Sequence, residues 1–134
     1  ALTTKESIKR WVDGYQNTLQ FKWAIVFNNE VVGSIDVVHL EEKLDAVEIG
    51  YALSRKCWGK GIMTEALIAV IDYLLEEAGC NRVAARHDVN NPASGKVMQK
   101  AGMIYEGTLR QYGKNNQGIC DMAYYSIIKA DRLK

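Results

Sequence analysis

Apolar residues recur at helical spacing in three parts of the chain, and each part carries its own end signals. The longest pattern runs over residues 62–78, where Gly79 is well placed to end a helix. A shorter helix is expected from Pro92, with Asn91 as its N-cap and Gly102 after its end. A third helix is expected over residues ~4–17, after a capping box, and its signals are Thr3, Glu6, Ile8, Trp11, Val12, Tyr15 and Leu19.

Runs of β-branched and aromatic residues between these helices are typical of strands. The expected strands cover residues 21–27, 31–38, 45–53, 82–88, 103–110 and 119–128. Asn28, Asn29 and Glu30 suit a tight hairpin turn between the first two strands, and residues 39–43 are expected to form a charged loop. The polar stretch 112–118 is expected to be the loop of a hairpin between the last two strands.

The predicted order of elements is α-β-β-β-α-β-α-β-β, which is typical of an α+β (mixed α/β) protein. The central strand–helix–strand step is a right-handed crossover, so its two strands are parallel if they share a sheet. The hairpins on either side of this step are antiparallel, and one mixed sheet with helices on its faces is the natural packing. A chain of 134 residues, with 48% hydrophobic residues and neither linker nor repeat, is expected to form one domain over 1–134.

Charge and cysteine content exclude several classes of protein. The 17 basic residues nearly balance the 16 acidic ones, so charge gives no reason to expect a nucleic-acid binder. No apolar stretch approaches the ~20 residues of a membrane span, and the polar start is not typical of a signal peptide. Three cysteines without CxxC spacing and two histidines argue against a disulfide framework or a metal site. They favour a reducing compartment, and we expect a cytoplasmic protein.

The candidate chemistry lies in the turn at residues 56–62, just before the longest predicted helix. Gly59 and Gly61 let the backbone approach a ligand, and the following helix begins with N–H groups that have no partner within the helix. The helix dipole makes this end partly positive, and Arg55, Lys56 and Lys60 add charge. These features favour a phosphate or pyrophosphate site, whereas a plain strand-to-helix connection with surface lysines is the alternative. Neither the P-loop pattern nor GxGxxG occurs here.

Three motifs follow one another along the chain. They are EIGYAL at 48–53 with WGKGIMTEA at 58–66, NPAS at 91–94 with VMQKAGM at 97–103, and EGTLR at 106–110 with DMAYYS at 121–126. Their order and spacing resemble the GNAT superfamily of acetyl-CoA-dependent N-acetyltransferases. The branch most similar is that of the ribosomal-protein N-terminal acetyltransferases (RimJ/RimL-like). The resemblance runs from about residue 20 to the end of the chain, and it favours the pyrophosphate interpretation of the turn.

The resemblance implies a mixed, mostly antiparallel sheet with helices on both faces and one parallel β-α-β step. It also implies attack of a primary amine on the thioester of acetyl-CoA, without a metal. Glu48 would be the base for the amine, Ser94 or Tyr124 would protonate the thiolate, and a backbone N–H of residues 49–52 would stabilise the oxyanion. The residues implied to contact coenzyme A are Ile49, Gly50, Tyr51, Ala52, Lys56, Cys57, Trp58, Gly59, Lys60, Gly61, Ile62, Asn91 and Ser94.

The sequence departs from the family pattern at several points. Lys56 stands where the family usually has Arg or Gln, and Met98 replaces a tyrosine that many relatives use as general acid. The chain lacks an initiator Met and begins late for this branch, so we expect a missing or shortened N-terminal part of the domain. Met98 and the short N-terminal part favour a coenzyme A-binding module without catalysis as the alternative function, and a purely structural domain is a third. Glu48 itself can equally be a solvated residue of a strand face.

The acceptor stays open at the level of sequence. A protein N-terminus and a small amine both fit the reaction that the resemblance implies, because acceptor pockets lie on variable loops. We expect neither a nucleic acid nor a membrane as partner. Many relatives are dimers, which makes a homodimer one of the expected states.

Overall fold

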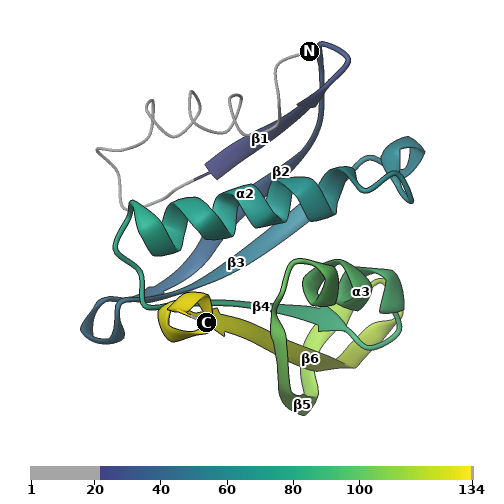
Figure 1. Cartoon of the computed structure of the whole chain (residues 1–134). Coiled ribbons are helices and arrows are strands. Elements are labelled where there is room, and N and C mark those ends of the chain that lie inside the picture. The colour runs from purple at the N-terminus through teal and green to yellow at the C-terminus, as the bar shows by residue number, and fades with distance from the viewer. Residues whose placement is uncertain (1–21, 134) are drawn as a thin grey trace.

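A computed structural model describes residues 22–133 of the chain. Its helices and strands are β1 (Lys22–Phe27), β2 (Glu30–Glu41), β3 (Ala46–Leu53), α2 (Ile62–Glu76), β4 (Arg82–Asp88), α3 (Pro92–Lys100), β5 (Ile104–Asn115) and β6 (Gly118–Ile128) (Figure 1). The strands form a six-stranded sheet in the order β1-β2-β3-β4-β6-β5. β3 and β4 pair in parallel, and the other recorded pairs are antiparallel. The predicted mixed fold is therefore confirmed, while the helix expected over residues ~4–17 lies outside the described residues.

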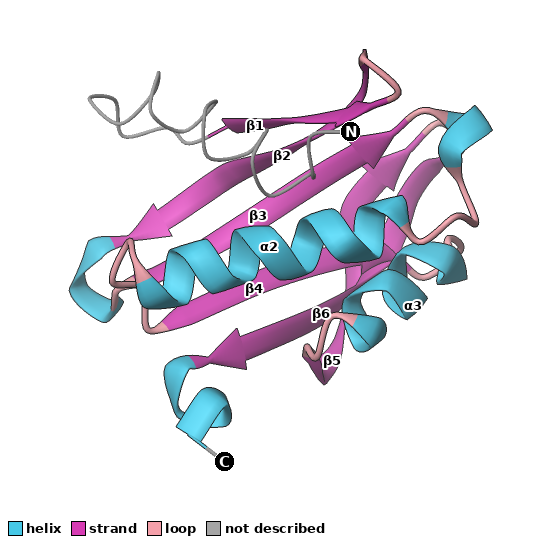
Figure 2. Cartoon of the chain, turned by 45° about the horizontal axis from the view of Figure 1, so that its top comes forward, coloured by secondary structure: helices cyan, strands magenta, loops and turns pink. Residues whose placement is uncertain are grey.

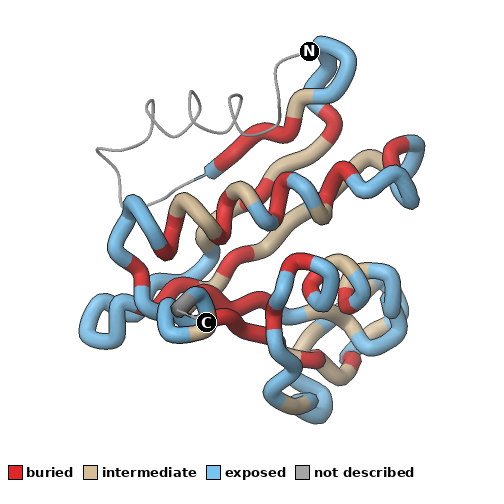
Figure 3. Tube along the Cα trace, in the orientation of Figure 1, coloured by how far each residue is buried: buried red, intermediate tan, exposed pale blue. Residues whose placement is uncertain are grey.

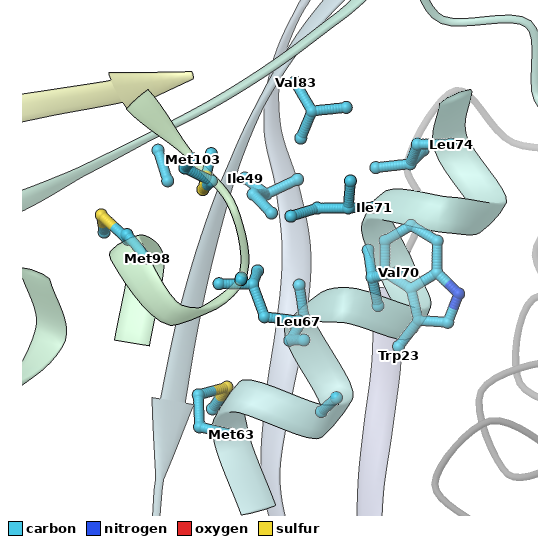
Figure 4. Close-up of a cluster of buried hydrophobic side chains, with 14 of the residues drawn as sticks. Trp23, Ile49, Met63, Leu67, Val70, Ile71, Leu74, Val83, Met98 and Met103 are labelled. Atoms are coloured by element: carbon cyan, nitrogen blue, oxygen red, sulfur yellow. The ribbon is translucent and has the colours of Figure 1, made fainter. Parts of the chain in front are cut away.

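The core lies between the sheet and α2, whose buried positions follow the helical repeat (Figure 3). Leu67 and Ile71 of this helix share a cluster with Ile49 and Val83 from the centre of the sheet (Figure 4). Met98 of α3 belongs to the same cluster and is fully buried. Both α-helices of residues 22–133 pack on one face of the sheet (Figure 2), whereas the resemblance implies helices on both faces.

The first hairpin turns as the sequence predicts. Asn28 and Asn29 have φ angles of +52° and +64°, the pair of left-handed residues that defines a type I′ turn. Asparagine tolerates this conformation better than most residues, which explains its use at both positions. Glu30 belongs to β2 rather than to the turn.

Two predicted loops are wrong, because in both places the strands extend further than the sequence predicts. β2 continues through His39 to Glu41, because these residues pair with the first residues of β3. β5 continues to Asn115 and β6 begins at Gly118, so the expected loop 112–118 shrinks to a turn at residues 116 and 117. In both places the polar side chains predict a loop. A strand with a solvated face carries polar residues too, and the neighbouring strand satisfies its backbone.

The centre of the sheet divides where β3 and β4 stop pairing. Their parallel register runs from Ala46 opposite Arg82 to Ile49 opposite Ala85 and is recorded no further. Beyond it, residues 50–53 of β3 pair only with β2, while residues 86–88 of β4 pair only with β6. This second half of β3 leads directly into the glycine turn and α2. One edge of the strand is thus left without a neighbouring strand just before the candidate site.

Candidate functional site

The glycine turn has a backbone that glycine alone adopts easily. Gly59 and Gly61 have φ angles of +76° and +77°, in the left-handed region. A Cβ atom added to either residue would meet no heavy atom within 4 Å beyond its chain neighbours. The backbone of the turn therefore faces open space, and conformation rather than crowding accounts for both glycines.

The N-terminus of α2 keeps its donors free. Gly61 is the N-cap residue, and no side chain caps the helix. The first helical bond of α2 runs from the Glu65 N–H to the Gly61 carbonyl oxygen at 3.1 Å. None of the described residues accepts a hydrogen bond from the amides of residues 59–64. Unpaired amides at the positive end of a 15-residue helix are an arrangement suited to a phosphate group.

The basic side chains around the turn differ in whether they already contact a partner within the protein. Lys56 Nζ lies 3.1 Å from both carboxylate oxygens of Glu30. The Arg55 guanidinium lies over the Trp58 ring, 5.4 Å from its centre, and the Trp58 Nε1–H donates to the Leu53 carbonyl oxygen at 2.9 Å. Lys60 is exposed and makes no ion pair with a described residue. Lys60 is therefore the cation of the turn that is most available to an anionic ligand.

Three of the residues predicted to contact coenzyme A, namely Ile49, Cys57 and Ile62, have side chains in the core, and that of Ile49 is 1% exposed. Cys57 and Ile62 are only 3% and 7% exposed and belong to the apolar cluster. The Cys57 amide donates to the Ser54 carbonyl oxygen at 2.9 Å, so it is not free for a ligand. The Cys57 side chain thus packs in the core, and Ile62 can reach a ligand only through its backbone.

Tyr51 and Ser94 join β3 to α3. The Tyr51 hydroxyl donates to the Ser94 carbonyl oxygen at 3.0 Å and lies 2.8 Å from Ser94 Oγ. Burial raises the pKa of Tyr51 to about 12, while the Ser94 hydrogen bond acts in the opposite direction. The phenol is therefore protonated at neutral pH and acts as a donor. Asn91 is the N-cap of α3, as predicted, but its exposed side chain makes no capping hydrogen bond.

Glu48 and Tyr124 are brought together by a residue that the sequence analysis did not single out. Arg86 Nε lies 3.0 Å from Glu48 Oε2, and Arg86 Nη1 donates to the Tyr124 hydroxyl at 2.8 Å. The guanidinium carbon also lies 5.7 Å from the ring centres of Tyr124 and Tyr112. The parallel register places Glu48 opposite Ala84, which makes Arg86 its diagonal neighbour on the same face. The alternation of β4 could have suggested this face, but only the register identifies the partner.

This cluster lies on the face of the sheet opposite the helices. Ile49 of β3 and Val83 of β4 face the helical core. Glu48 is one residue from Ile49 and Arg86 is three residues from Val83, so strand alternation turns both side chains to the other face. β5 is irregular here, because its register shifts between Leu109 and Gly113. An open cavity of about 840 Å³ adjoins the cluster and is lined by Thr108, Leu109, Arg110, Gln111, Tyr112 and Asp121.

Neither a metal site nor a membrane span is found in the part of the chain that the structure describes. No group of three His, Cys, Asp or Glu side chains among residues 22–133 could hold a metal ion. Within the same residues, no helix combines the length and the apolar character needed to cross a bilayer.

Comparison with known proteins gives one consistent result. The family model described as "Acetyltransferase (GNAT) domain" matches residues 2–104. The uncharacterized N-acetyltransferase p20 of Bacillus licheniformis is 30% identical over 84% of the chain. The ribosomal-protein-serine acetyltransferase of Escherichia coli (strain K12) is 30% identical over 93% of the chain and 72% of its own length.

A solved structure agrees with these relatives. The ribosomal L7/L12 α-N-protein acetyltransferase RimL, crystallised in complex with coenzyme A, superposes with a TM-score of 0.80 at 26% identity. That match covers 92% of the chain and 70% of RimL. The chain spans only 63% of the length of p20 and 66% of another Bacillus N-acetyltransferase, so it corresponds to about two-thirds of these relatives.

Proposed function

The chain belongs to the acetyltransferase (GNAT) domain family, and from that premise we propose that it transfers the acetyl group of acetyl-CoA to a primary amine. One observation carries the proposal: the half of β3 that has lost its β4 partner runs directly into an uncapped helix N-terminus. Such a strand edge and such amides are the two backbone features that an extended ligand with a diphosphate would use.

The turn fits a diphosphate in conformation and charge. Glycines at positions 59 and 61 leave open space where a Cβ atom would stand, and the amides from Gly59 onward have no described acceptor. In our proposal these amides and Lys60 hold the phosphates, with Trp58 beside them. The backbone of residues 49–52 would serve the acyl end, where an N–H group stabilises the oxyanion; such a donor is worth ~3 kcal/mol. Ser94 and Asn91 of α3 would border the ligand from the other side.

We assign the base to Glu48. An alkylamine has a pKa of ~10.4 and a peptide α-amine one of ~7.7–8.0, so the acceptor must lose a proton before it attacks. Glu48 stands on the last paired stretch of β3, one residue before the pairing with β4 ends, and its side chain is 18% exposed. A carboxylate at this point can take the amine proton directly or through one water molecule.

Tyr124 ranks ahead of Ser94 as the acid. Its hydroxyl accepts a hydrogen bond from Arg86, which leaves its own proton available for the departing thiolate. Ser94 is held through its hydroxyl and carbonyl by Tyr51. Met98, at the position of the usual family tyrosine, is a thioether with no proton to donate.

For the acceptor, we propose a protein N-terminus or a small amine. Relatives named as ribosomal-protein acetyltransferases support the first. Asp36 supports a cationic acceptor of either kind, because it pairs opposite Gly50 and its Oδ1 is buried with no partner among the described residues. The second candidate function is a coenzyme A-binding module without catalysis, which is favoured by Met98 in place of the usual family tyrosine.

The test is an acceptor panel with acetyl-CoA and detection of free thiol. We expect thiol release that depends on an amine and saturates with acetyl-CoA. Glu48→Gln should lower turnover most at low pH, where more of the acceptor is protonated, and should leave acetyl-CoA affinity unchanged. Glu42→Gln, the same change at an exposed site, is the matched control. Binding of acetyl-CoA with no turnover for any amine would favour the inactive module, and no binding would remove both functions.

We further propose a cytoplasmic location and a homodimer. Three free cysteines, Cys57, Cys80 and Cys120, are all buried, which suits a reducing compartment. The dimer rests on the resemblance alone. Cell fractionation and sedimentation equilibrium of the full chain test the two proposals separately.

A further inference from the structure

Arg86 contacts both the proposed base and one of the two candidate acids. It forms an ion pair with Glu48 on β3, donates a hydrogen bond to Tyr124 on β6, and lies over the Tyr112 ring from β5. Three strands therefore meet at one side chain. We infer that Arg86 is a positioning residue that holds Glu48 and Tyr124 in a fixed mutual arrangement; this inference rests on the proposed function.

The shape of the guanidinium explains why arginine suits this position. Nε lies within ion-pair distance of the carboxylate and Nη1 donates to the phenol, so one rigid plane contacts both partners through two different nitrogens. A lysine ammonium is a single point charge on a flexible stem and does not impose two directions at once. The aromatic rings of Tyr112 and Tyr124 restrict the plane further.

The contact with Tyr124 also orients the hydroxyl proton. Because Arg86 can only donate, the phenol oxygen accepts, and the hydroxyl hydrogen must point elsewhere. The same guanidinium lies 3.0 Å from Glu48 Oε2 and so places a positive charge beside the proposed base. One side chain thus contacts both the proposed base and the proposed acid.

The same strand contains a matched pair that serves as a control. Arg82, four residues earlier on the same face of β4, makes a two-pronged contact with Glu106 at 2.6 and 2.8 Å. This contact raises the pKa of Arg82 and lowers that of Glu106. Arg82 lies at the opposite end of the β3–β4 pairing, opposite Ala46, away from the unpaired half of β3. It therefore has the charge and the exposure of Arg86 but no contact with the proposed acid or base.

The experiment compares Arg86→Met, Arg86→Lys and Arg82→Met in the acceptor-dependent thiol assay. Arg86→Met should lower kcat by about 100-fold, the effect typical of ~1 Å of misplacement, with KM for acetyl-CoA within about twofold of wild type. Arg86→Lys should restore only part of the lost kcat, because lysine keeps the positive charge but lacks the planar group whose two nitrogens contact Glu48 and Tyr124. Arg82→Met should keep kcat within about twofold. The double variant Glu48→Gln/Arg86→Met should lose far less than the product of the two single losses.

Each result has a definite consequence. A kcat for Arg86→Met equal to that of Arg82→Met overturns the inference, and so does full activity of Arg86→Lys. If Arg86→Met fails to fold, Arg86→Lys alone tests the inference. A wild-type kcat in Arg86→Lys would mean that the planar guanidinium has no positioning role. A wild-type protein without acceptor-dependent turnover would instead defeat the proposed function, so the two failures are distinguishable.

Discussion

The two ends of α2 use glycine in the same conformation and differ in what happens to the backbone groups around it. Gly61 at the N-terminal end has φ of +77°, and Gly79 after the C-terminal end has φ of +80°. At the C-terminal end the chain is tied back, because the amides of Ala78 and Cys80 donate to carbonyls of the last helical turns. At the N-terminal end no described residue takes up the free amides. A left-handed glycine thus ends the helix at its C-terminus, whereas at the N-terminus it precedes amides that stay free.

Charge distinguishes the two ends further. Arg55, Lys56 and Lys60 precede the helix, whereas Glu76 and Glu77 stand at its end. Both placements oppose the helix dipole, which favours acidic groups at the N-terminus and basic ones at the C-terminus. An anion bound at the N-terminal end would offset the unfavourable interaction between the basic residues and the helix dipole. The charges therefore support a ligand at the N-terminal end of α2 and none at its C-terminal end.

The largest expected effect comes from Gly59→Glu. A carboxylate placed in the open space of the turn repels a diphosphate and occupies its volume, so we expect coenzyme A affinity to fall by about 100-fold, or two steps of 1.4 kcal/mol. Isothermal titration calorimetry measures the change. Gly79→Glu is the control, because Gly79 has the same left-handed backbone and the same open surroundings at the other end of the helix. Equal losses in the two variants would contradict a ligand site at the N-terminal end.

A smaller effect is expected from alanine at the same two ends. Gly61→Ala and Gly79→Ala should each lower the free energy of unfolding by about 1–2 kcal/mol, because an L-residue is strained at these φ angles. Urea denaturation measures both. Only Gly61→Ala should also weaken coenzyme A binding, since its methyl group enters the space in front of the free amides. Unchanged affinity in that variant would mean that the ligand does not approach this backbone.

The smallest effect concerns the lysines of the turn. Lys60→Gln should weaken coenzyme A binding by about two- to fivefold at low salt, and by less at high ionic strength, because its charge is exposed and screened. Lys56→Gln should have a weaker effect, since Glu30 already holds Lys56. Affinity measured at two salt concentrations tests both variants. A larger loss for Lys56→Gln would show that the Glu30 pair opens when the ligand binds.

Local patterns predicted the parts of the fold that neighbouring residues decide. The bounds of β4 agree with the prediction of a strand at 82–88, and α3 begins at Pro92 after Asn91 as expected. Helical periodicity located α2, and Gly59 and Gly61 take the left-handed backbone that the turn was expected to need. The errors at residues 39–43 and 112–118 arose where a partner strand, rather than composition, decides how far a strand extends.

By itself, the sequence determined the glycine turn, the helix that follows it, and the resemblance that relates both to acetyl-CoA. The tertiary structure alone decided that Glu48, Arg86 and Tyr124 meet, that Tyr51 holds Ser94, and that Cys57 points into the core. The physical reason is the separation along the chain of the residues that interact. Helix periods and glycine turns depend on interactions within a few residues, whereas Arg86 and Tyr124 lie 38 residues apart and meet only through strand register. Register is set by the packing of the whole sheet, which no local pattern contains.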